Sequence, residues 1–234
     1  MLPVVIIAGG LATRMYPLTK ETPKSLIKIL GKPFIYHQLM LLKRNGIDSV
    51  IVCLGHLGWM IEEYLALNDF PINIRFSYDG ETPIGTGGAV FKATQGLESP
   101  FFVLYGDSYL DIGYQEIEEA YKKCKQQCLM TVFRNNGLLD KSNVEYNNGR
   151  IIIYSKSKPS SNMEHIDFGL SILTHSNLVE HGSDKAFDLA NVFERLSVDG
   201  NLYGYEVFNR FYEVGSQEGL IDLERYLNKA ESNE

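Results

Sequence analysis

Short apolar runs alternate with amphipathic segments along the first half of the chain. Three of the runs are rich in β-branched and aromatic residues, and glycine-containing turns follow them: Val4 to Ile7, Val50 to Leu54 and Phe101 to Tyr105. Continuous apolar runs of this length are typical of parallel strands that are buried on both faces.

Helical periodicity appears between and after these runs. From Phe34 to Asn45 apolar residues recur at a spacing of three to four, and Gly46 provides a C-terminal stop. The order strand, helix, strand predicts βαβ units. Two further helices are predicted by the same spacing, at Ile117, Ala120, Tyr121 and Cys124, and at Leu189, Val192, Phe193 and Leu196 behind an expected N-cap at Asp188.

The pattern changes in the middle of the chain. Asn143 to Tyr146 and Arg150 to Tyr154 flank Asn147-Asn148-Gly149, which is typical of a tight antiparallel hairpin. A further extended run from Ile166 to Leu173 and a last helix from about Ser216 to Lys229 complete the pattern. We therefore expect a mixed sheet with an α/β first half, within one domain that spans residues 1–234.

Composition narrows the classes of partner. The formal net charge of -7 and the pI near 5.3 argue against a nucleic-acid-binding protein, since such proteins need a cationic field. No apolar run is long enough to cross a bilayer, and the N-terminus lacks the pattern of a secretory signal, so we expect a cytoplasmic protein. The three cysteines fit neither a disulfide framework nor zinc spacing, and we interpret them as reduced and structural.

The loop after the first strand is cationic and opens with two glycines. Gly9 and Gly10 allow backbone N–H groups to approach a ligand closely, which predicts a phosphate seat. Ligands of open α/β sheets bind beyond the carboxyl ends of the strands, where Arg14 and Lys24 would meet phosphate oxygens. On spacing alone an ordinary βα turn with solvated cations is about as good an explanation, and neither the Walker nor the dinucleotide-binding pattern fits.

A carboxylate follows the third strand in a similar position. Gly106-Asp107-Ser108 places Asp107 just past the tip of a buried strand, where oxygen ligands suit Mg²⁺. Without further information, a turn capped by the aspartate is the commoner role of such a tripeptide.

Longer strings decide between these alternatives. The string from Gly9 to Arg14, with Pro17-Leu18-Thr19 and Pro23 to Leu26, resembles the signature loop of sugar-1-phosphate nucleotidyltransferases, with Ala12 where the usual form has glycine. The resemblance extends over most of the chain through four more segments: Gly31 to Phe34, Gly85 to Ala89, Gly106-Asp107, and Phe211 to Gly215. It implies a Rossmann-like mixed, mainly parallel sheet flanked by helices, with an antiparallel sugar-binding portion.

The resemblance also implies a reaction. A sugar 1-phosphate oxygen attacks the α-phosphorus of a nucleoside triphosphate, and pyrophosphate leaves. Arg14 would then bind the triphosphate and the departing pyrophosphate, Lys24 the α-phosphate region, and Asp107 a Mg²⁺ ion. Glu213 stands where many relatives have a second metal-binding aspartate. Because the nucleophile is already an anion, catalysis can consist of alignment and charge neutralisation.

Several binding positions are carried over from the same resemblance. The residues assigned to the nucleotide are Gly9, Gly10, Ala12, Thr13, Gly85, Thr86 and Gly87; those assigned to the sugar phosphate are Lys156, Asp167 and Gly169. From spacing alone, the glycines at 85 and 87 serve helix packing slightly better, Lys156 is a solvated hairpin lysine, and Asp167 equally well braces its strand. Ser155 replaces the acid that many relatives use to bind sugar hydroxyls.

The branch that the chain resembles most comprises mannose-1-phosphate and D-glycero-D-manno-heptose-1-phosphate guanylyltransferases. A uridylyltransferase or another nucleotidyltransferase for a different sugar is an alternative, and so is a sensor domain that has lost catalysis. Relatives commonly associate, so a homo-oligomer is possible. No role is assigned to the five histidines, and Trp59 and Tyr64 are expected to serve packing rather than stacking on a ligand.

Overall fold

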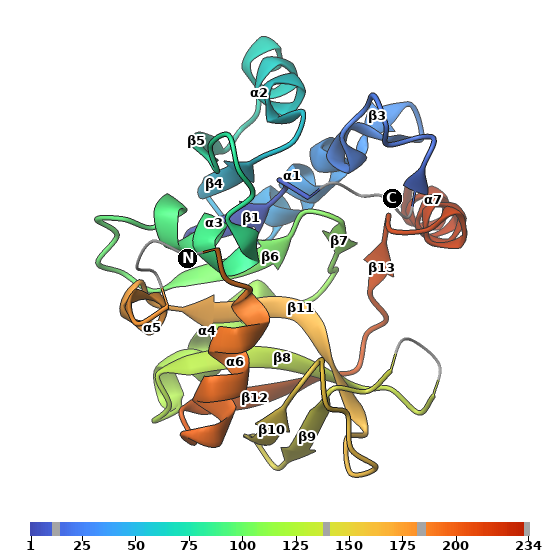
Figure 1. Ribbon diagram of the computed structural model, residues 1–234. Helices are drawn as coiled ribbons and strands as arrows, with labels where there is room; N and C mark the ends of the chain where they lie inside the picture. Colours follow the sequence, from blue (N-terminus) through green and yellow to red (C-terminus); the bar gives the residue numbers. More distant parts are fainter. Residues whose placement is uncertain (11–14, 138–140, 182–185, 232–234) are drawn as a thin grey trace.

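The computed structural model describes residues 1–10, 15–137, 141–181 and 186–231. Within these residues the centre is a nine-stranded sheet in the order β5-β4-β1-β6-β11-β8-β12-β10-β9, so that β5 and the β9–β10 hairpin lie at opposite ends (Figure 1). Its strands are β1 (Val4–Ile7), β4 (Ser49–Leu54), β5 (Asn73–Tyr78), β6 (Phe101–Tyr105), β8 (Cys128–Arg134), β9 (Val144–Asn147), β10 (Arg150–Tyr154), β11 (His165–Leu173) and β12 (Leu202–Val207).

The sheet is parallel in its first part and mixed beyond it. Strands β4, β1 and β6 are parallel neighbours, as the apolar runs predict, and β5, which was not predicted, extends them in parallel beyond β4. Strand β11 then joins β6 and β8 in antiparallel pairings, and β8 pairs with β12 in parallel. The expected βαβ half and the antiparallel portion are both confirmed.

Two-stranded ribbons and helices complete the architecture. The ribbons pair β2 (Lys28–Ile29) with β3 (Lys32–Pro33), and β7 (Ser108–Tyr109) with β13 (Tyr212–Glu213). The helices are the 3-10 turn η2 (Lys24–Leu26) and α1 (Phe34–Arg44), α2 (Gly58–Leu67), α3 (Gly85–Ala93), α4 (Tyr114–Lys123), α5 (Ser176–Val179), α6 (Leu189–Val198) and α7 (Gln217–Glu231). No described helix is both long and apolar enough to cross a membrane.

Helices cover both faces of the sheet. Alternate residues of β1 belong to different cores: Val4 and Ile6 pack with α1, α2 and α4, whereas Val5 packs with α3 and α6. Burial on both faces explains why the early strands are continuously apolar rather than alternating. A third, smaller core lies between α7, α1 and the β7–β13 ribbon.

The structure tests two local predictions, the tight turn at Asn148-Gly149 and the N-cap at Asp188. Asn148 and Gly149 have φ of 46° and 83°, which confirms the tight β9–β10 turn. Helix α6 begins directly after Asp188, but the aspartate side chain does not cap it. Asp188 thus occupies the N-cap position as expected, while the Thr86 hydroxyl, rather than the aspartate carboxylate, accepts the Leu189 N–H at 2.9 Å.

The sequence also predicted structural roles for the cysteines and for two aromatic side chains. All three cysteines are free, and Cys53 and Cys128 are buried, in agreement with the structural interpretation. Tyr64 packs against the first core as expected. Trp59 is 59% exposed, so its expected packing role was wrong.

Candidate active site

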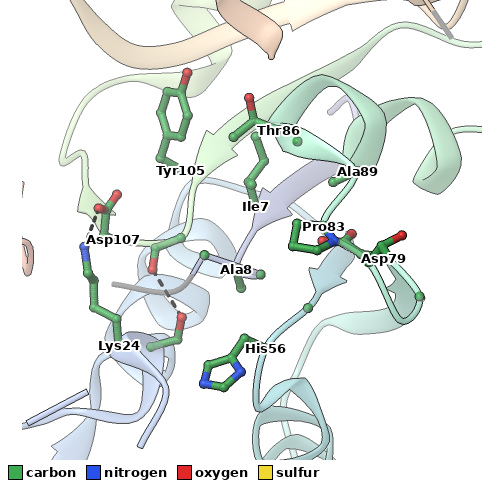
Figure 2. Close-up of a pocket in the computed structure, with 18 of the residues that line it drawn as sticks. Ile7, Ala8, Lys24, His56, Asp79, Pro83, Thr86, Ala89, Tyr105 and Asp107 are labelled. Atoms are coloured by element: carbon green, nitrogen blue, oxygen red, sulfur yellow. Dashed lines mark hydrogen bonds and ion pairs between the residues drawn. The ribbon is translucent and has the colours of Figure 1, made fainter. Parts of the chain in front are cut away.

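A cavity of about 520 Å³ lies at the carboxyl edge of the parallel strands (Figure 2). The segments that line it follow β1, β4, β5 and β6 or belong to η2 and the start of α3. The lining comprises residues 7–10, 24, 25, 55, 56, 79–83, 85, 86, 89 and 105–107. This is the edge at which open α/β sheets bind ligands.

Glycines let the strand tips come together on the floor of the cavity. A Cβ atom on Gly9 would lie 2.9 Å from both the Gly55 nitrogen and a carboxylate oxygen of Asp79. Only glycine therefore fits at position 9. Among the described residues nothing lies within 4 Å of a Cβ atom built on Gly10, so they leave this backbone open.

A lysine and an aspartate from distant parts of the chain meet at one side of the cavity. Lys24 Nζ lies 2.9 Å from Asp107 Oδ2, and the two side chains are 19% and 34% exposed (Figure 2). The neighbouring backbone is fixed because the Ser25 hydroxyl donates to the Gly106 carbonyl, and Gln38 Nε2 donates to the carbonyls of residues 105 and 108. A cation and a carboxylate thus stand next to open glycine backbone.

The predicted site includes three further residues of the first loop. Ala12, Thr13 and Arg14 lie outside the described residues.

Glu213 lies in the small ribbon next to Asp107 in the fold, but it is not among the residues that line the cavity. It pairs with Ser108, the residue after Asp107, and the Val214 N–H donates to the Asp107 carbonyl. Among the described residues no group of three or more His, Cys, Asp or Glu side chains is arranged to hold a metal ion. Any metal here would therefore take one or two carboxylates from the chain and its remaining ligands from elsewhere.

The glycine turn at the start of α3 packs closely against Phe187 and also contributes residues to the cavity lining. Gly85 has a φ of +74°, and a Cβ atom there would overlap the carbonyl oxygen of Phe187. A Cβ atom on Gly87 would overlap the Phe187 ring, and the Gly87 N–H donates to the Phe187 carbonyl at 3.0 Å. Gly85 and Thr86 line the cavity, whereas Gly87 does not. For Gly87 the packing explanation fits better.

The residues predicted to bind a sugar phosphate gather around Tyr105. Lys156 Nζ lies 5.5 Å from the centre of the Tyr105 ring. Asp167 Oδ1 accepts the Gly169 N–H at 3.0 Å, and a Cβ atom on Gly169 would lie 3.6 Å from Tyr105. Burial raises the pKa of Asp167, although the nearby Lys156 charge and the Gly169 N–H oppose this shift. Because Tyr105 also lines the cavity, it connects the two groups of predicted residues.

The lining residues that were not predicted to have a role include His56, Asp79 and Tyr105. Each lies at or within two residues of the end of a parallel strand, which is the signal that could have identified them. Burial raises the pKa of Asp79, and the Lys92 charge opposes the shift. Figure 2 shows Asp79 at the opposite end of the cavity from the Lys24–Asp107 pair.

This arrangement suits a phosphorylated ligand. Lys24 and open backbone can bind phosphate oxygens, and Asp107 can bind a divalent cation. A family model described as nucleotidyl transferase matches residues 3–228.

Curated relatives match over part of their length. A mannose-1-phosphate guanyltransferase of Hypocrea jecorina is 35% identical over 123 residues, which are 50% of this chain and 34% of the relative. A D-glycero-alpha-D-manno-heptose 1-phosphate guanylyltransferase of Campylobacter jejuni is 33% identical over 114 residues, which are 49% of this chain and 51% of the relative. These alignments thus span about half or less of the relatives' length.

A solved structure matches over nearly the whole chain. HddC of Yersinia pseudotuberculosis, crystallised with GMP-PN, has a TM-score of 0.80 and 24% identity. The match covers 97% of this chain and 100% of that one. At this identity the likeness shows the fold.

Proposed function

Because this chain belongs to the nucleotidyl transferase family, we propose that it joins a nucleoside triphosphate to a sugar 1-phosphate and releases pyrophosphate. The preferred substrates in this proposal are GTP and a manno-configured hexose or heptose 1-phosphate. The observation that carries the proposal is the Lys24–Asp107 pair beside the open backbone of Gly10 in one cavity.

The choice of substrates rests on the relatives. The Hypocrea protein is named for guanylyl transfer to mannose 1-phosphate, and the Campylobacter protein for the same transfer to a manno-heptose 1-phosphate. Both alignments cover about half of this chain, so guanine and the manno configuration are proposed for it on this likeness.

Mg²⁺ is proposed as the cofactor, because the donors fit it. Mg²⁺ typically takes one or two carboxylates and completes its shell with water and substrate phosphates. The carboxylate of Asp107 lines the cavity, and the backbone of Glu213 pairs with Ser108, the residue after Asp107. When bound, the ion would neutralise part of the negative charge of the phosphates.

The chain's own residues would align and hold the two substrates. Lys24 lies on the cavity wall, where its ammonium group can bind the α-phosphate region. We assign Arg14 to the triphosphate and the departing pyrophosphate on the family resemblance. No residue is needed as a general base, since a sugar phosphate oxygen is already ionised.

Pyrophosphate release with a panel of nucleoside triphosphates and sugar 1-phosphates, with and without Mg²⁺, tests this function. We expect the fastest release with GTP and mannose 1-phosphate or the manno-heptose 1-phosphate, and only with the metal. A preference for UTP and glucose 1-phosphate would favour a uridylyltransferase. Binding of a sugar nucleotide without any turnover would favour a sensor domain and contradict the proposal.

A further inference from the structure

The turn that carries Asp107 is held by hydrogen bonds from distant parts of the chain. It connects β6 to β7, and each backbone carbonyl of residues 105–108 accepts a hydrogen bond from outside the turn. The Ser25 hydroxyl donates to the second of these carbonyls at 3.3 Å, and the Val214 N–H donates to the third at 2.9 Å. Gln38 of α1 donates to the first and the last.

Gln38 joins the two ends of this turn through a single atom. Its Nε2 donates to the Tyr105 carbonyl at 3.0 Å and to the Ser108 carbonyl at 2.8 Å. An amide nitrogen carries two hydrogens, so both are used. The opposite orientation of the amide would set its oxygen against two carbonyl oxygens, which is unfavourable. The two carbonyls therefore fix the amide, and the amide in turn fixes the spacing of the two carbonyls.

The burial of Gln38 is unusual for its residue type. Its exposure is 1%, and the other buried residues of α1 are apolar. The amide oxygen, Oε1, has no hydrogen-bond partner among the described residues. An unpartnered acceptor in a core is unfavourable, and an apolar side chain of similar size would avoid it. What a glutamine provides at this position is therefore the pair of N–H groups.

The same turn is also tied to β1. The Gly106 N–H donates to the Ile7 carbonyl at 2.9 Å, and a Cβ atom on Gly106 would lie 2.5 Å from that same oxygen. The turn thus rests directly on the end of β1. From this turn the Asp107 side chain extends to Lys24 at one side of the cavity (Figure 2).

We propose that Gln38 is a positioning residue for Asp107, because it holds both ends of the turn from which the carboxylate reaches Lys24 and the cavity. Gln38 is not among the lining residues, so it acts through the turn rather than on a ligand. Its importance for turnover rests on the proposed function. Mg²⁺ demands nearly ideal geometry of its oxygen ligands, so a displaced carboxylate would bind the ion less well.

Gln38→Met tests this role. Methionine fills a similar volume but has no N–H group, so both carbonyls lose their donor. With GTP and mannose 1-phosphate, we expect the Mg²⁺ concentration for half-maximal pyrophosphate release to rise about tenfold, the value of one ordinary hydrogen bond. At saturating Mg²⁺ the KM for each substrate should stay near the wild-type value.

Thr94→Val is the matched control. Thr94 is buried away from the cavity, and its hydroxyl donates to the Val90 carbonyl at 2.8 Å. This change also removes a buried hydrogen bond to a backbone carbonyl, so it should lower the Tm and leave the Mg²⁺ requirement unchanged. If Gln38→Met behaves in the same way, Gln38 has only a structural role and the inference is overturned.

Hydrogen–deuterium exchange of the protein without substrates or metal gives a readout that does not depend on activity. We expect the amides of residues 105–108 to exchange faster in Gln38→Met than in the wild type, and at the wild-type rate in Thr94→Val. Gln38→Asn takes the place of Gln38→Met if the latter does not fold. Its amide is shorter by one methylene and cannot reach both carbonyls, so the same shifts are expected.

The outcomes separate this inference from the proposed function. Wild-type exchange of residues 105–108 in a folded Gln38 variant would show that Gln38 does not hold the turn, and would overturn the inference while the activity stands. If the wild type turns over no pair of substrates, the proposed function fails. Hydrogen exchange then decides on Gln38 by itself, and equal rates in wild type and variant overturn its positioning role.

Discussion

The carboxylate of Asp107 is held from several directions. Lys24 lies 2.9 Å from one of its oxygens, and the Ser108 hydroxyl donates to the other at 3.4 Å. Its backbone carbonyl accepts the Val214 N–H at 2.9 Å. A carboxylate fixed in this way is ordered before any substrate arrives, which favours electrostatic catalysis.

Asp107→Asn tests the proposed metal role at this residue. The amide has nearly the same shape but no charge, so we expect metal-dependent pyrophosphate release to fall about a hundredfold or more while the fold is retained. Release rates across a Mg²⁺ titration, with circular dichroism for the fold, provide the measurement. Asp48→Asn, which changes an aspartate that is 74% exposed and pairs with Lys43, should be neutral. Wild-type rates in Asp107→Asn would remove Asp107 from the metal site.

At the scale of elements, the α3 turn and the start of α6 form one unit. The Thr86 hydroxyl of α3 accepts the first N–H of α6, and the Phe187 carbonyl accepts N–H groups from Gly87 and Gly88. Each helix start thus satisfies backbone groups of the other, which replaces the usual side-chain cap. The close approach requires glycine at position 85, because a Cβ atom would overlap Phe187.

Gly85→Ala and Gly96→Ala separate backbone strain from this overlap. Both glycines have nearly the same φ, +74° and +77°, but a Cβ atom on Gly96 would meet no atom of the described residues within 4 Å. We expect Gly96→Ala to lower the free energy of unfolding by about 1 kcal/mol. Gly85→Ala should lower it by about 1–3 kcal/mol more, because of the overlap. Urea denaturation measures both, and equal losses would show that the contact with Phe187 does not matter.

At the scale of the whole molecule, side-chain contacts tie the chain ends to the sheet and helices. Glu118 of α4 accepts the N–H of Leu2 at 2.8 Å and pairs with Lys122. At the other end Tyr226 of α7 donates to Asp111, which also pairs with Arg44 of α1. The second contact holds α7 against the β7–β13 ribbon that carries Glu213.

Glu118 makes the first of these ties dependent on pH. Burial acts to raise its pKa, but hydrogen bonds from Lys122 and Leu2 and the Lys122 charge outweigh burial and hold the pKa below its ordinary value of 4.5. A lowered folded pKa means that the group stabilises the fold at neutral pH, and that this contribution is lost as the pH falls through the lowered pKa. We expect Glu118→Gln to lower the Tm near pH 7, with a difference from wild type that shrinks below about pH 4.5.

Thermal unfolding at several pH values, with Glu119→Gln as control, checks this. Glu119 is 51% exposed and lies 4.0 Å from Lys123, so its loss should change the Tm little at any pH. A Tm difference for Glu118→Gln that is independent of pH would contradict the charge argument.

Local patterns of the sequence determined the kinds of element, and longer strings suggested candidate site residues. Continuous apolar runs predict β1, β4 and β6 because burial on both faces leaves no polar position. The Asn-Gly turn predicts the β9–β10 hairpin because few residues tolerate positive φ. The same signals did not identify β5, in which half-buried residues are interspersed with exposed ones. Lys24 and Asp107 were identified because they occur in long strings that resemble a known family.

Only the tertiary structure decided which of these residues meet. Lys24 and Asp107 are 83 positions apart, and Thr86 and Asp188 are 102 apart. Periodicity and propensity act over a few residues, whereas these pairings depend on the order of strands in the sheet. The same order placed Tyr105 where it lines the cavity and also lies under the Lys156 ammonium group. Packing, which joins distant segments, thus fixed the partners that local sequence left open.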